Sequence, residues 1–442
     1  MLPCWQSFST SSGRSPPGAS RRRRNCTWIE ASTSGAAGCS TRPFFGSSWS
    51  CLAPSLAATP RSSRAMWRTQ AAGTAACCCR STTLCGPGPH GVSSWRTFPL
   101  TLIGIDLMNE ASLRAAKETL RAVPCELLAG DIGQPGAICE ELRRRGVDCR
   151  QVLHVRSFLD HDRPFLPPQR RPEGARARFV RHHFVESAYL DKAGNLLAAE
   201  EVYQSLVEHL QRWAEILNGH GLCMLEAMLL DVPTTRRYFE DNVSFHFDIE
   251  AALSRQYLVP AVPFCMALAE AGLFSSLQGW RCFPESGEYC RILTQHLRRQ
   301  PFRVRLADHR DLDTLESLQT PGPLQVSRAQ LEQRLRLAPL GALLAEAADG
   351  PLAAIYTTRL PEESLARAEI EQVSQGPVLQ IIALMAAPEA PGVGALLRDF
   401  VLQLAQVEGV ETCIGLSRCG SWAGSGLGME DYIRSTSKRG AL

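Results

Sequence analysis

Several carboxylates stand at the ends of short apolar segments, where they could do chemistry. In chain order they are Asp106, Asp131, Asp160, Asp162 and Glu226. Short apolar runs bounded by polar residues are typical of β-strands, and in a parallel sheet ligands bind beyond the carboxyl ends of the strands. A carboxylate at such a position can accept two hydrogen bonds from the vicinal hydroxyls of a ribose. Asp106, at the end of the run 101–106, is predicted to bind a ribose in this way.

A glycine-rich turn precedes Asp106. Residues 85–91 contain Gly86, Gly88 and Gly91, and Gly88 lies 18 residues before the carboxylate. That separation suits a nucleotide-binding loop, in which glycines let the backbone approach the ligand closely. An ordinary turn is the alternative, because no apolar strand precedes these glycines and no acidic residue stands directly before them.

A second glycine turn lies nearer the C-terminus. An apolar run over 378–385 is followed by the turn 388–395, which contains Gly392 and Gly394, and then by apolar residues at helical spacing. A strand, a glycine turn and a helix in this order can bind a pyrophosphate, because the free amides at a helix N-terminus meet the anion. Glu389 would repel that anion, so its replacement by Gln is expected to tighten binding by about tenfold or more.

Strands and helices alternate in the segments that carry these residues. The predicted strands cover 101–106, 125–129, 151–155 and 222–225, and the predicted helices cover 110–123, 135–145 and 196–217. Alternation of this kind predicts an α/β domain with a mostly parallel, doubly wound sheet. A strand at 302–307 begins a second, smaller α+β domain. The expected parts of the chain are 1–80, disordered, 81–300 and 301–420, folded, and 421–442, a disordered tail.

Residues 1–95 differ in composition from the rest of the chain. They hold ten Arg, no Lys and a single acidic residue, Glu30, for a charge of +9, whereas 96–442 hold 37 basic against 43 acidic residues, for −6. A segment so rich in Arg and Ser and so poor in apolar periodicity is predicted to be disordered. Three interpretations stay open: sequence not native to the mature protein, an organelle transit peptide, and a basic RNA-binding arm.

The composition of the remainder argues against several classes of protein. The longest apolar run, 258–274, is interrupted by Pro260, Pro263 and Glu270, so no membrane span is predicted. The cysteines after residue 95 form no C-x-x-C pair, which favours reduced thiols and an intracellular compartment, cytoplasmic or organellar, with a plastid implied if the N-terminus is a transit peptide. A net negative charge argues against a nucleic-acid partner.

Three motifs resemble a known family. They are residues 104–107 (Gly-Ile-Asp-Leu), 130–133 (Gly-Asp-Ile-Gly) and 154–164 (His-Val-Arg-Ser-Phe-Leu-Asp-His-Asp-Arg-Pro). They resemble the S-adenosylmethionine-dependent methyltransferase domains of modular polyketide synthases, most closely the starter-unit domains of loading modules. The resemblance implies a Rossmann-like class I fold, S-adenosylmethionine as methyl donor, an acyl group on an acyl carrier protein as substrate, and other synthase modules as partners. It also implies that Asp106 binds the donor ribose and that Asp131 lies near its adenine.

The resemblance also implies a metal, because some starter-unit domains of this family hold a mononuclear centre beside the donor. The implied ligands are His161, Glu226 and His246, with Asp162 and Asp248 as further carboxylates in the same segments. Two imidazoles and a carboxylate with open positions suit Fe(II) or Mn(II). Such a metal could hold a dicarboxylate-type acyl group and stabilise an enolate during carbon methylation. The alternative is that both histidines are hydrogen-bonded loop residues.

The second domain resembles a GCN5-related N-acetyltransferase (GNAT) fold. The acetyl-CoA loop of that family reads Gln/Arg-x-x-Gly-x-Gly/Ala; Gly392 and Gly394 match it, while Glu389 stands at the basic or amide position. The chain is thus predicted to be a methyltransferase fused to a GNAT-like domain. Two alternatives stay open: a catalytically inactive synthase fragment, and an acyl-CoA-binding domain of acetyltransferase or decarboxylase type.

Overall fold

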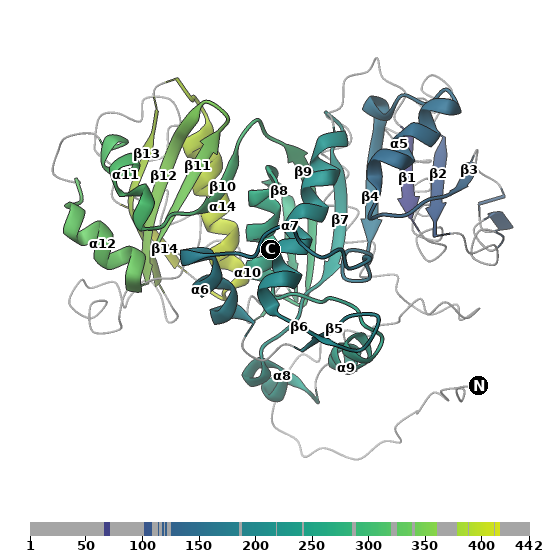
Figure 1. Ribbon diagram of the computed structural model, residues 1–442, viewed down its shortest axis with the longest axis horizontal. Helices are drawn as coiled ribbons and strands as arrows, with labels where there is room; N and C mark the ends of the chain where they lie inside the picture. The colour runs from purple at the N-terminus through teal and green to yellow at the C-terminus, as the bar shows by residue number, and fades with distance from the viewer. Residues whose placement is uncertain are drawn as a thin grey trace, which may run out of the picture.

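Two large β-sheets with helices between and around them, and one small two-stranded sheet, make up the described part of the chain (Figure 1). The computed structural model describes residues 66–70, 101–107, 114, 117–118, 120–121, 125–184, 188–217, 219–240, 243–284, 289–319, 325–337, 341–359, 378–387, 389–410 and 412–415. Gly86, Gly88 and Gly91, most of the helix predicted over 110–123, and the tail 421–442 lie outside these residues.

The first sheet has seven strands in the order β3-β2-β1-β4-β7-β9-β8. They are β1 (Met66–Gln70), β2 (Leu102–Asp106), β3 (Cys125–Ala129), β4 (Val152–Ser157), β7 (Leu222–Ala227), β8 (Leu273–Phe283) and β9 (Ile292–Arg299). The pairs from β3 to β7 are parallel, and β9 is antiparallel to both of its neighbours. This confirms the predicted mostly parallel α/β sheet. Because the chain leaves β1 toward β2 and later returns to β4 on the other side, the strand order reverses between β1 and β4, where ligands are expected to bind.

Strand β1 differs from the expectation that no strand precedes residue 80. Its residues pair in parallel with β2 on one side and with β4 on the other. The segment Met-Trp-Arg-Thr-Gln is not the apolar run by which strands are found in a sequence. Sheet pairing uses backbone amides and carbonyls, which all five of these residues carry, so a mixed segment can complete a sheet between two strands that would otherwise lack partners.

Two strands also follow β7, at which the sequence analysis ends the series. The long apolar run 258–274 divides between helix α10 (Ala261–Glu270), which is buried all round, and the first residues of β8. Strand β9 then returns between β7 and β8. A short apolar run does not by itself distinguish a buried helix from a buried strand, which is why this hairpin was not predicted.

The helix predicted over 196–217 is observed as α7 (Ala199–Ile216). The apolar stripe predicted for it is buried and consists of Val202, Leu206, Leu210, Trp213 and Leu217. Residues 196–197 instead form β6 (Leu196–Leu197), which pairs with β5 (Tyr189–Leu190). The helix predicted over 135–145 is α5 (Pro135–Arg144), and α6 (Gly174–His183) packs on α7. In Figure 1, α8 (Val232–Tyr238) and α9 (His246–Leu253) lie with β5 and β6 below the first sheet.

The second sheet has five strands in the order β10-β11-β12-β13-β14. They are β10 (Arg303–Leu306), β11 (Ala342–Ala347), β12 (Gly350–Arg359), β13 (Val378–Ala386) and β14 (Thr412–Gly415). The pairs are antiparallel except for the last, β13 with β14, which is parallel. Helices α11 (Leu312–Ser317), α12 (Arg328–Leu337) and α14 (Val393–Val407) accompany it. A mainly antiparallel sheet with helices confirms the predicted smaller α+β unit.

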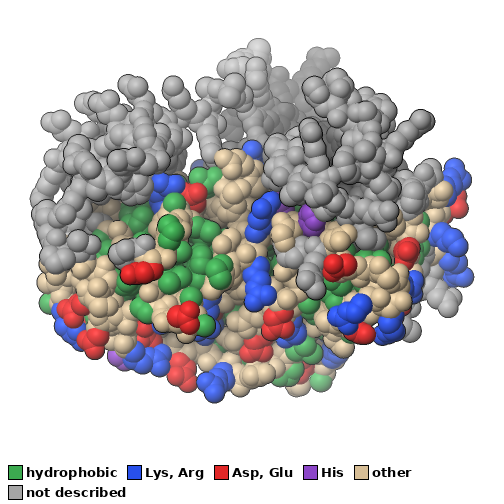
Figure 2. Space-filling model, turned by 90° about the horizontal axis from the view of Figure 1, so that it is seen from above, with side chains coloured by type: hydrophobic (Ala, Val, Ile, Leu, Met, Phe, Trp, Pro, Cys, Tyr) green, Lys and Arg blue, Asp and Glu red, His purple; other side chains and the backbone are tan. Residues whose placement is uncertain are grey.

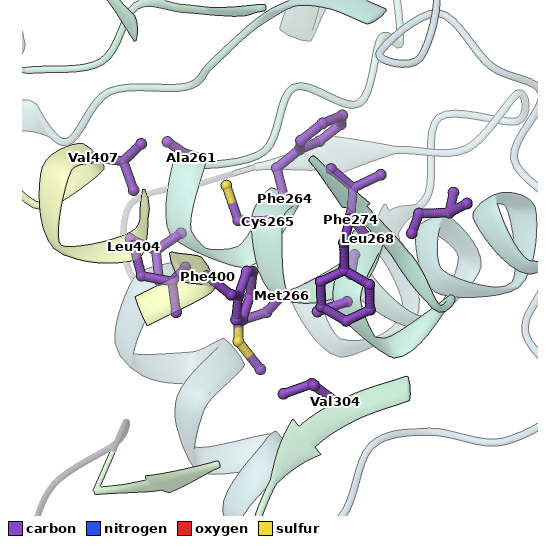
Figure 3. Close-up of a cluster of buried hydrophobic side chains, with 14 of the residues drawn as sticks. Ala261, Phe264, Cys265, Met266, Leu268, Phe274, Val304, Phe400, Leu404 and Val407 are labelled. Atoms are coloured by element: carbon purple, nitrogen blue, oxygen red, sulfur yellow. The ribbon is translucent and has the colours of Figure 1, made fainter. Parts of the chain in front are cut away.

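One hydrophobic core joins the two sheets. Helices α10 and α14 lie between them (Figure 1), and α14 contacts both β8 and its own sheet. Figure 3 shows this core, in which the Phe274 ring from β8 lies 5.5 Å from the Phe302 ring and 5.7 Å from the Phe400 ring of α14. The side-chain amide of Gln403 donates to the Ser275 carbonyl at 2.9 Å. The α/β unit and the α+β unit therefore pack as a continuous body along this seam.

The surface carries charges of both signs. On the face shown in Figure 2, Lys and Arg side chains are interspersed with Asp and Glu and do not gather into one basic area. In the described part of the chain, no helix combines the length and apolar character needed to cross a membrane.

Candidate active site

The turn after β4 carries the motif that the sequence analysis singles out. Strand β4 lies at the reversal of strand order, and its last residues lead into Phe158, which has a positive φ of 55°. The Phe158 amide donates to the Leu225 carbonyl at 2.7 Å, so the turn is fixed against the end of β7. A positive φ is unusual for a bulky residue and is held here by its surroundings. The turn brings His161 back over the carboxyl edge of the sheet.

His161 and Glu226 form a buried pair. The Nδ1 atom of His161 lies 2.5 Å from Oε1 of Glu226 in β7, and the two side chains are 6 % and 1 % exposed. Burial would lower the pKa of His161, but the attraction and the hydrogen bond of the Glu226 carboxylate outweigh burial, so the pKa lies above its ordinary value. A histidine whose Nδ1 is bound to a carboxylate has a fixed ring orientation, with Nε2 left for a substrate.

The Glu226 carboxylate is fully engaged by the protein. Oε1 also accepts a hydrogen bond from its own strand, from the Ala227 amide at 2.7 Å. Oε2 accepts from the amides of Asp160 at 2.7 Å and His161 at 3.3 Å. A carboxylate with about four lone-pair sites, all used in this way, has none left for a metal ion. Glu226 therefore fixes the orientation of the His161 ring and favours its protonated form.

The implied metal ligands do not assemble in the described residues. Glu226 is occupied as above, Asp248 forms an ion pair with Arg291 at 2.6 Å, and Asp162 is exposed. His246 begins α9, but its side chain lies outside the described part. Among the described side chains, no group of three or more His, Cys, Asp or Glu is arranged to hold a metal. Within the implied set, the Glu226 carboxylate binds the His161 imidazole, and an Fe(II) or Mn(II) centre with His246 as a further ligand stays a prediction.

The two carboxylates predicted to meet the methyl donor lie at neighbouring strand ends. Asp106 ends β2 and pairs in register with Ala129, the last residue of β3, and the Gly130 amide donates to the Asp106 carbonyl at 2.9 Å. Asp131 follows directly, and its Oδ1 accepts from the Gly133 amide at 2.7 Å. Among the described residues, none forms a hydrogen bond or ion pair with the Asp106 side chain. The structure thus brings Asp106 and Asp131 to one edge of the sheet, as predicted.

A second buried polar cluster lies behind the His161 turn, and sequence reasoning missed it. Arg156 in β4 and Asp160 are each 1 % exposed and form an ion pair of 3.1 Å. His209 of α7 lies 3.3 Å from the same carboxylate, and burial lowers the pKa of His209 to about 4. Arg163 donates to the Asp160 carbonyl at 2.8 Å and to the Val202 carbonyl at 3.2 Å. Two arginines in an otherwise apolar neighbourhood were the available signal, since buried arginines are rare unless paired.

The second candidate site is the N-terminus of α14. Gly392 precedes the helix with φ of 88°, which favours glycine, and a Cβ there would meet nothing within 4 Å. A Cβ on Gly394 would lie 3.4 Å from the Ala386 Cβ, an ordinary van der Waals contact, so the packing of α14 on β13 does not require glycine at this position. No side chain caps the helix. Its first amides therefore suit an anion, as predicted.

Glu389, which was expected to repel an anion at that helix end, lies at the protein surface. Its side chain is exposed. Arg398, the residue that could have neutralised it, pairs with Asp399 at 2.7 Å instead. Because water screens an exposed charge, the exposed Glu389 carboxylate repels a phosphate much less than a buried carboxylate at the same distance would.

The chain is similar to a methyltransferase family and to two GNAT-like domains of solved structure. Residues 93–295 match the family model of the AprA MT2-like domain, a methyltransferase family. The loading GNATL domain of CurA from Lyngbya majuscula is 27 % identical, over 29 % of this chain and 71 % of that one, with a TM-score of 0.24. The GphF GNAT-like decarboxylase in complex with isobutyryl-CoA is 33 % identical, over 32 % of this chain and 78 % of that one, with a TM-score of 0.24.

A third solved structure is similar to more than half of the chain. The CMeT domain of the citrinin polyketide synthase is 16 % identical, over 57 % of this chain, with a TM-score of 0.32. The present chain covers 51 % of that structure. No curated protein matches the chain.

Proposed function

Because residues 93–295 form a methyltransferase domain of the AprA MT2-like family, we propose that this domain methylates the α-carbon of a carrier-bound acyl group, with S-adenosylmethionine as donor. The observation that carries the proposal is the buried His161–Glu226 pair at the carboxyl edge of the sheet. An acyl thioester needs a base to lose its α-proton, and an imidazole held by a carboxylate is such a base. The carrier protein, and a place in starter-unit assembly, follow from the resemblance of residues 154–164.

In the proposed reaction, His161 is the general base. Its Nε2 removes the proton from the α-carbon, and the electron pair left on the carbon forms the new bond to the methyl group. S-adenosylmethionine, when bound, would supply the methyl group as an electrophile: the bond between the methyl carbon and the sulfonium sulfur breaks as the carbon–carbon bond forms, and the sulfur keeps that electron pair and leaves as a neutral thioether. The imidazolium that results is stabilised by the Glu226 carboxylate, 2.5 Å from Nδ1. The Phe247 ring meets the His161 ring edge-on at 5.4 Å between centroids, which limits the movement of the imidazole.

The direct test is methyl transfer by the full chain. The chain would be incubated with S-adenosylmethionine and a carrier protein loaded with malonyl or methylmalonyl groups, and the acyl arm would be weighed by mass spectrometry. Gain of one methyl group on the acyl carbon is the expected result. If the carrier gains no methyl group with any such acyl group, while the chain binds the donor, the acyl-carrier proposal is wrong.

Asp106→Ala is expected to weaken donor binding by about 1.5–3 kcal/mol, because a hydrogen bond to a charged group is lost. The substitution should leave the fold intact, since Asp106 ends a strand and supports no described residue through its side chain. Titration calorimetry with S-adenosylmethionine measures the change. Asp148→Ala, at another carboxylate of the same domain, serves as control. Equal affinity of Asp106→Ala and the unsubstituted chain would remove Asp106 from the donor site.

Glu226→Gln is expected to change the pH dependence of methyl transfer. In the unsubstituted chain the pKa of His161 is raised, so the neutral base forms, and the rate rises, only as the pH passes above the ordinary histidine value of 6.5. Glutamine removes the charge that raises this pKa and leaves burial, which lowers it. The rise in rate should therefore move to lower pH, while the plateau falls because the base is weaker. An unchanged pH profile would contradict the assignment.

For the second unit we propose binding of an acyl-CoA or acyl-phosphopantetheine group at the N-terminus of α14, with Gly392 and Gly394 in the loop. The positive φ of Gly392 and the uncapped helix support it. Acetyl transfer and decarboxylation are the two activities that such a site could serve, and they are distinguished by whether acetyl-CoA or a malonyl thioester is consumed.

Glu389→Gln is expected to change CoA affinity by about fivefold or less, because an exposed carboxylate contributes only about 0.2–1 kcal/mol. This replaces the larger effect expected from the sequence, which assumed a carboxylate facing the helix end. Fluorescence or calorimetric titration with acetyl-CoA at two salt concentrations measures it. A gain well above this range would show that the carboxylate does face the phosphates.

A further inference from the structure

The turn that carries Asp131 is held from behind by helix α7. The indole Nε1 of Trp213 donates to the Ile132 carbonyl at 2.9 Å. The neighbouring side chain, Arg212, donates through Nε to the Gly133 carbonyl at 3.1 Å. Both acceptors belong to the turn between β3 and α5, which begins with Asp131. The position of this turn is therefore set by the last turn of α7.

The Trp213 ring also contacts the buried Arg156–Asp160 ion pair, through the Arg156 guanidinium. The Arg156 guanidinium carbon lies 4.5 Å from the centroid of the Trp213 ring, within the range of a cation–π contact. Arg156 pairs with Asp160 at 3.1 Å, and Trp213, Arg156 and Asp160 are all almost completely buried. Removed from water, such contacts have little freedom, so a shift of the ring is transmitted to the ion pair.

The path ends at the catalytic pair. The Asp160 amide donates to Oε2 of Glu226 at 2.7 Å, and Glu226 holds His161. Contacts therefore run without interruption from the Ile132 carbonyl through Trp213, Arg156 and Asp160 to Glu226. One end of the path lies beside the donor carboxylates, and the other end is the proposed base.

We propose that Trp213, Arg156 and Asp160 are positioning residues that hold the donor turn and the His161–Glu226 pair at a fixed separation. The inference rests on the proposed function, because it assigns these residues to the geometry of methyl transfer. In methyl transfer the donor and the attacking carbon must meet in line, and a small displacement of either lowers the rate strongly. If the cluster only stabilised the fold, substitutions in it would change donor binding and kcat together.

Separate substitutions at the two ends test the proposal. Trp213→Phe keeps an aromatic ring for Arg156 but loses the hydrogen bond to Ile132, so the Kd for S-adenosylmethionine should rise by about fivefold with little change in kcat at saturating donor. Asp160→Asn keeps the amide bond to Glu226 but loses the charge that holds Arg156, so kcat should fall by about tenfold with the donor Kd within about twofold. Arg212→Met, which removes the hydrogen bond to the Gly133 carbonyl, should also raise the Kd for S-adenosylmethionine. Because Arg212 is only half-buried, this variant is less prone to misfold.

Leu210→Val is the matched control, since Leu210 is fully buried in the same helix but lies outside the path. It should lower stability and leave the donor Kd and kcat unchanged. If Trp213→Phe and Arg212→Met bind the donor as tightly as the unsubstituted chain, or if Leu210→Val reproduces their effects, the inference is wrong. If the unsubstituted chain binds no S-adenosylmethionine, the proposed function and this inference are both wrong. If it binds the donor normally, but Trp213→Phe does not act mainly on the donor Kd and Asp160→Asn mainly on kcat, the inference alone is wrong.

Discussion

His161→Gln is expected to slow methyl transfer by about a thousandfold while the chain stays folded and still binds S-adenosylmethionine, because general-base catalysis contributes about 10²–10⁴ to such reactions. Glutamine can still donate an amide hydrogen bond toward Glu226, so the buried carboxylate is not left without a partner. It cannot accept a proton at neutral pH. The loss should therefore fall on kcat, measured by single-turnover transfer to the acyl carrier, and not on the affinity for the donor.

His182→Gln is the control for this experiment, because it removes an exposed imidazole of the same domain. It is expected to transfer methyl groups at the unsubstituted rate. Retention of most of the activity in His161→Gln would assign the proton transfer to another group, and the buried pair would then be a structural feature of the turn after β4.

Phe274→Ala is expected to destabilise the chain by about 3–5 kcal/mol, the usual cost of removing a buried phenylalanine ring. Phe274 is 5 % exposed and packs on Phe302 and Phe400, which belong to the other unit. The cavity would therefore open within the seam itself. Guanidinium unfolding, followed by hydrogen exchange of peptides from β4 and from β11, measures the effect on both units.

Both sets of peptides should lose protection together in the Phe274→Ala variant. Leu253→Ala, at a position 77 % exposed on α9, is the control and should change the free energy of unfolding by less than about 0.5 kcal/mol. If only the peptides of one unit lose protection, the two units unfold independently and the seam contributes little to either.

Strands that contain a short apolar run could be predicted from the sequence. β3 was predicted with its observed bounds, and β2, β4 and β13 within one or two residues at each end. β1 could not be predicted, because its pairing is made by backbone groups and its side chains carry no periodic signal. The β8–β9 hairpin was lost in an apolar stretch whose first part is helical.

The sequence could predict which residues belong to the candidate site, but it could not predict the role of each residue. His161 and Glu226 lie 65 residues apart along the chain, and nothing in that separation shows that the carboxylate binds the imidazole. As residue types, a histidine and a glutamate fit a metal site as well as they fit a hydrogen-bonded catalytic pair. Asp106 and Asp131 were easier, since each follows its strand directly and parallel strands end at a common edge. Contacts such as Arg156 with Trp213 depend on helix α7 crossing behind β4, which only the fold determines.

The helix that covers β8 has a consequence for recombining parts of this chain with other proteins. β8 is the outer strand of the first sheet, and α14, more than a hundred residues later, supplies Gln403 to one of its carbonyls. A junction placed between β9 and β10, where the two units separate along the sequence, would remove that cover. The bared strand would then offer unpaired backbone groups beside exposed Phe274, a surface on which chains pair edge to edge and aggregate. Chimeras of this protein should therefore exchange both units together, with the crossover placed outside them.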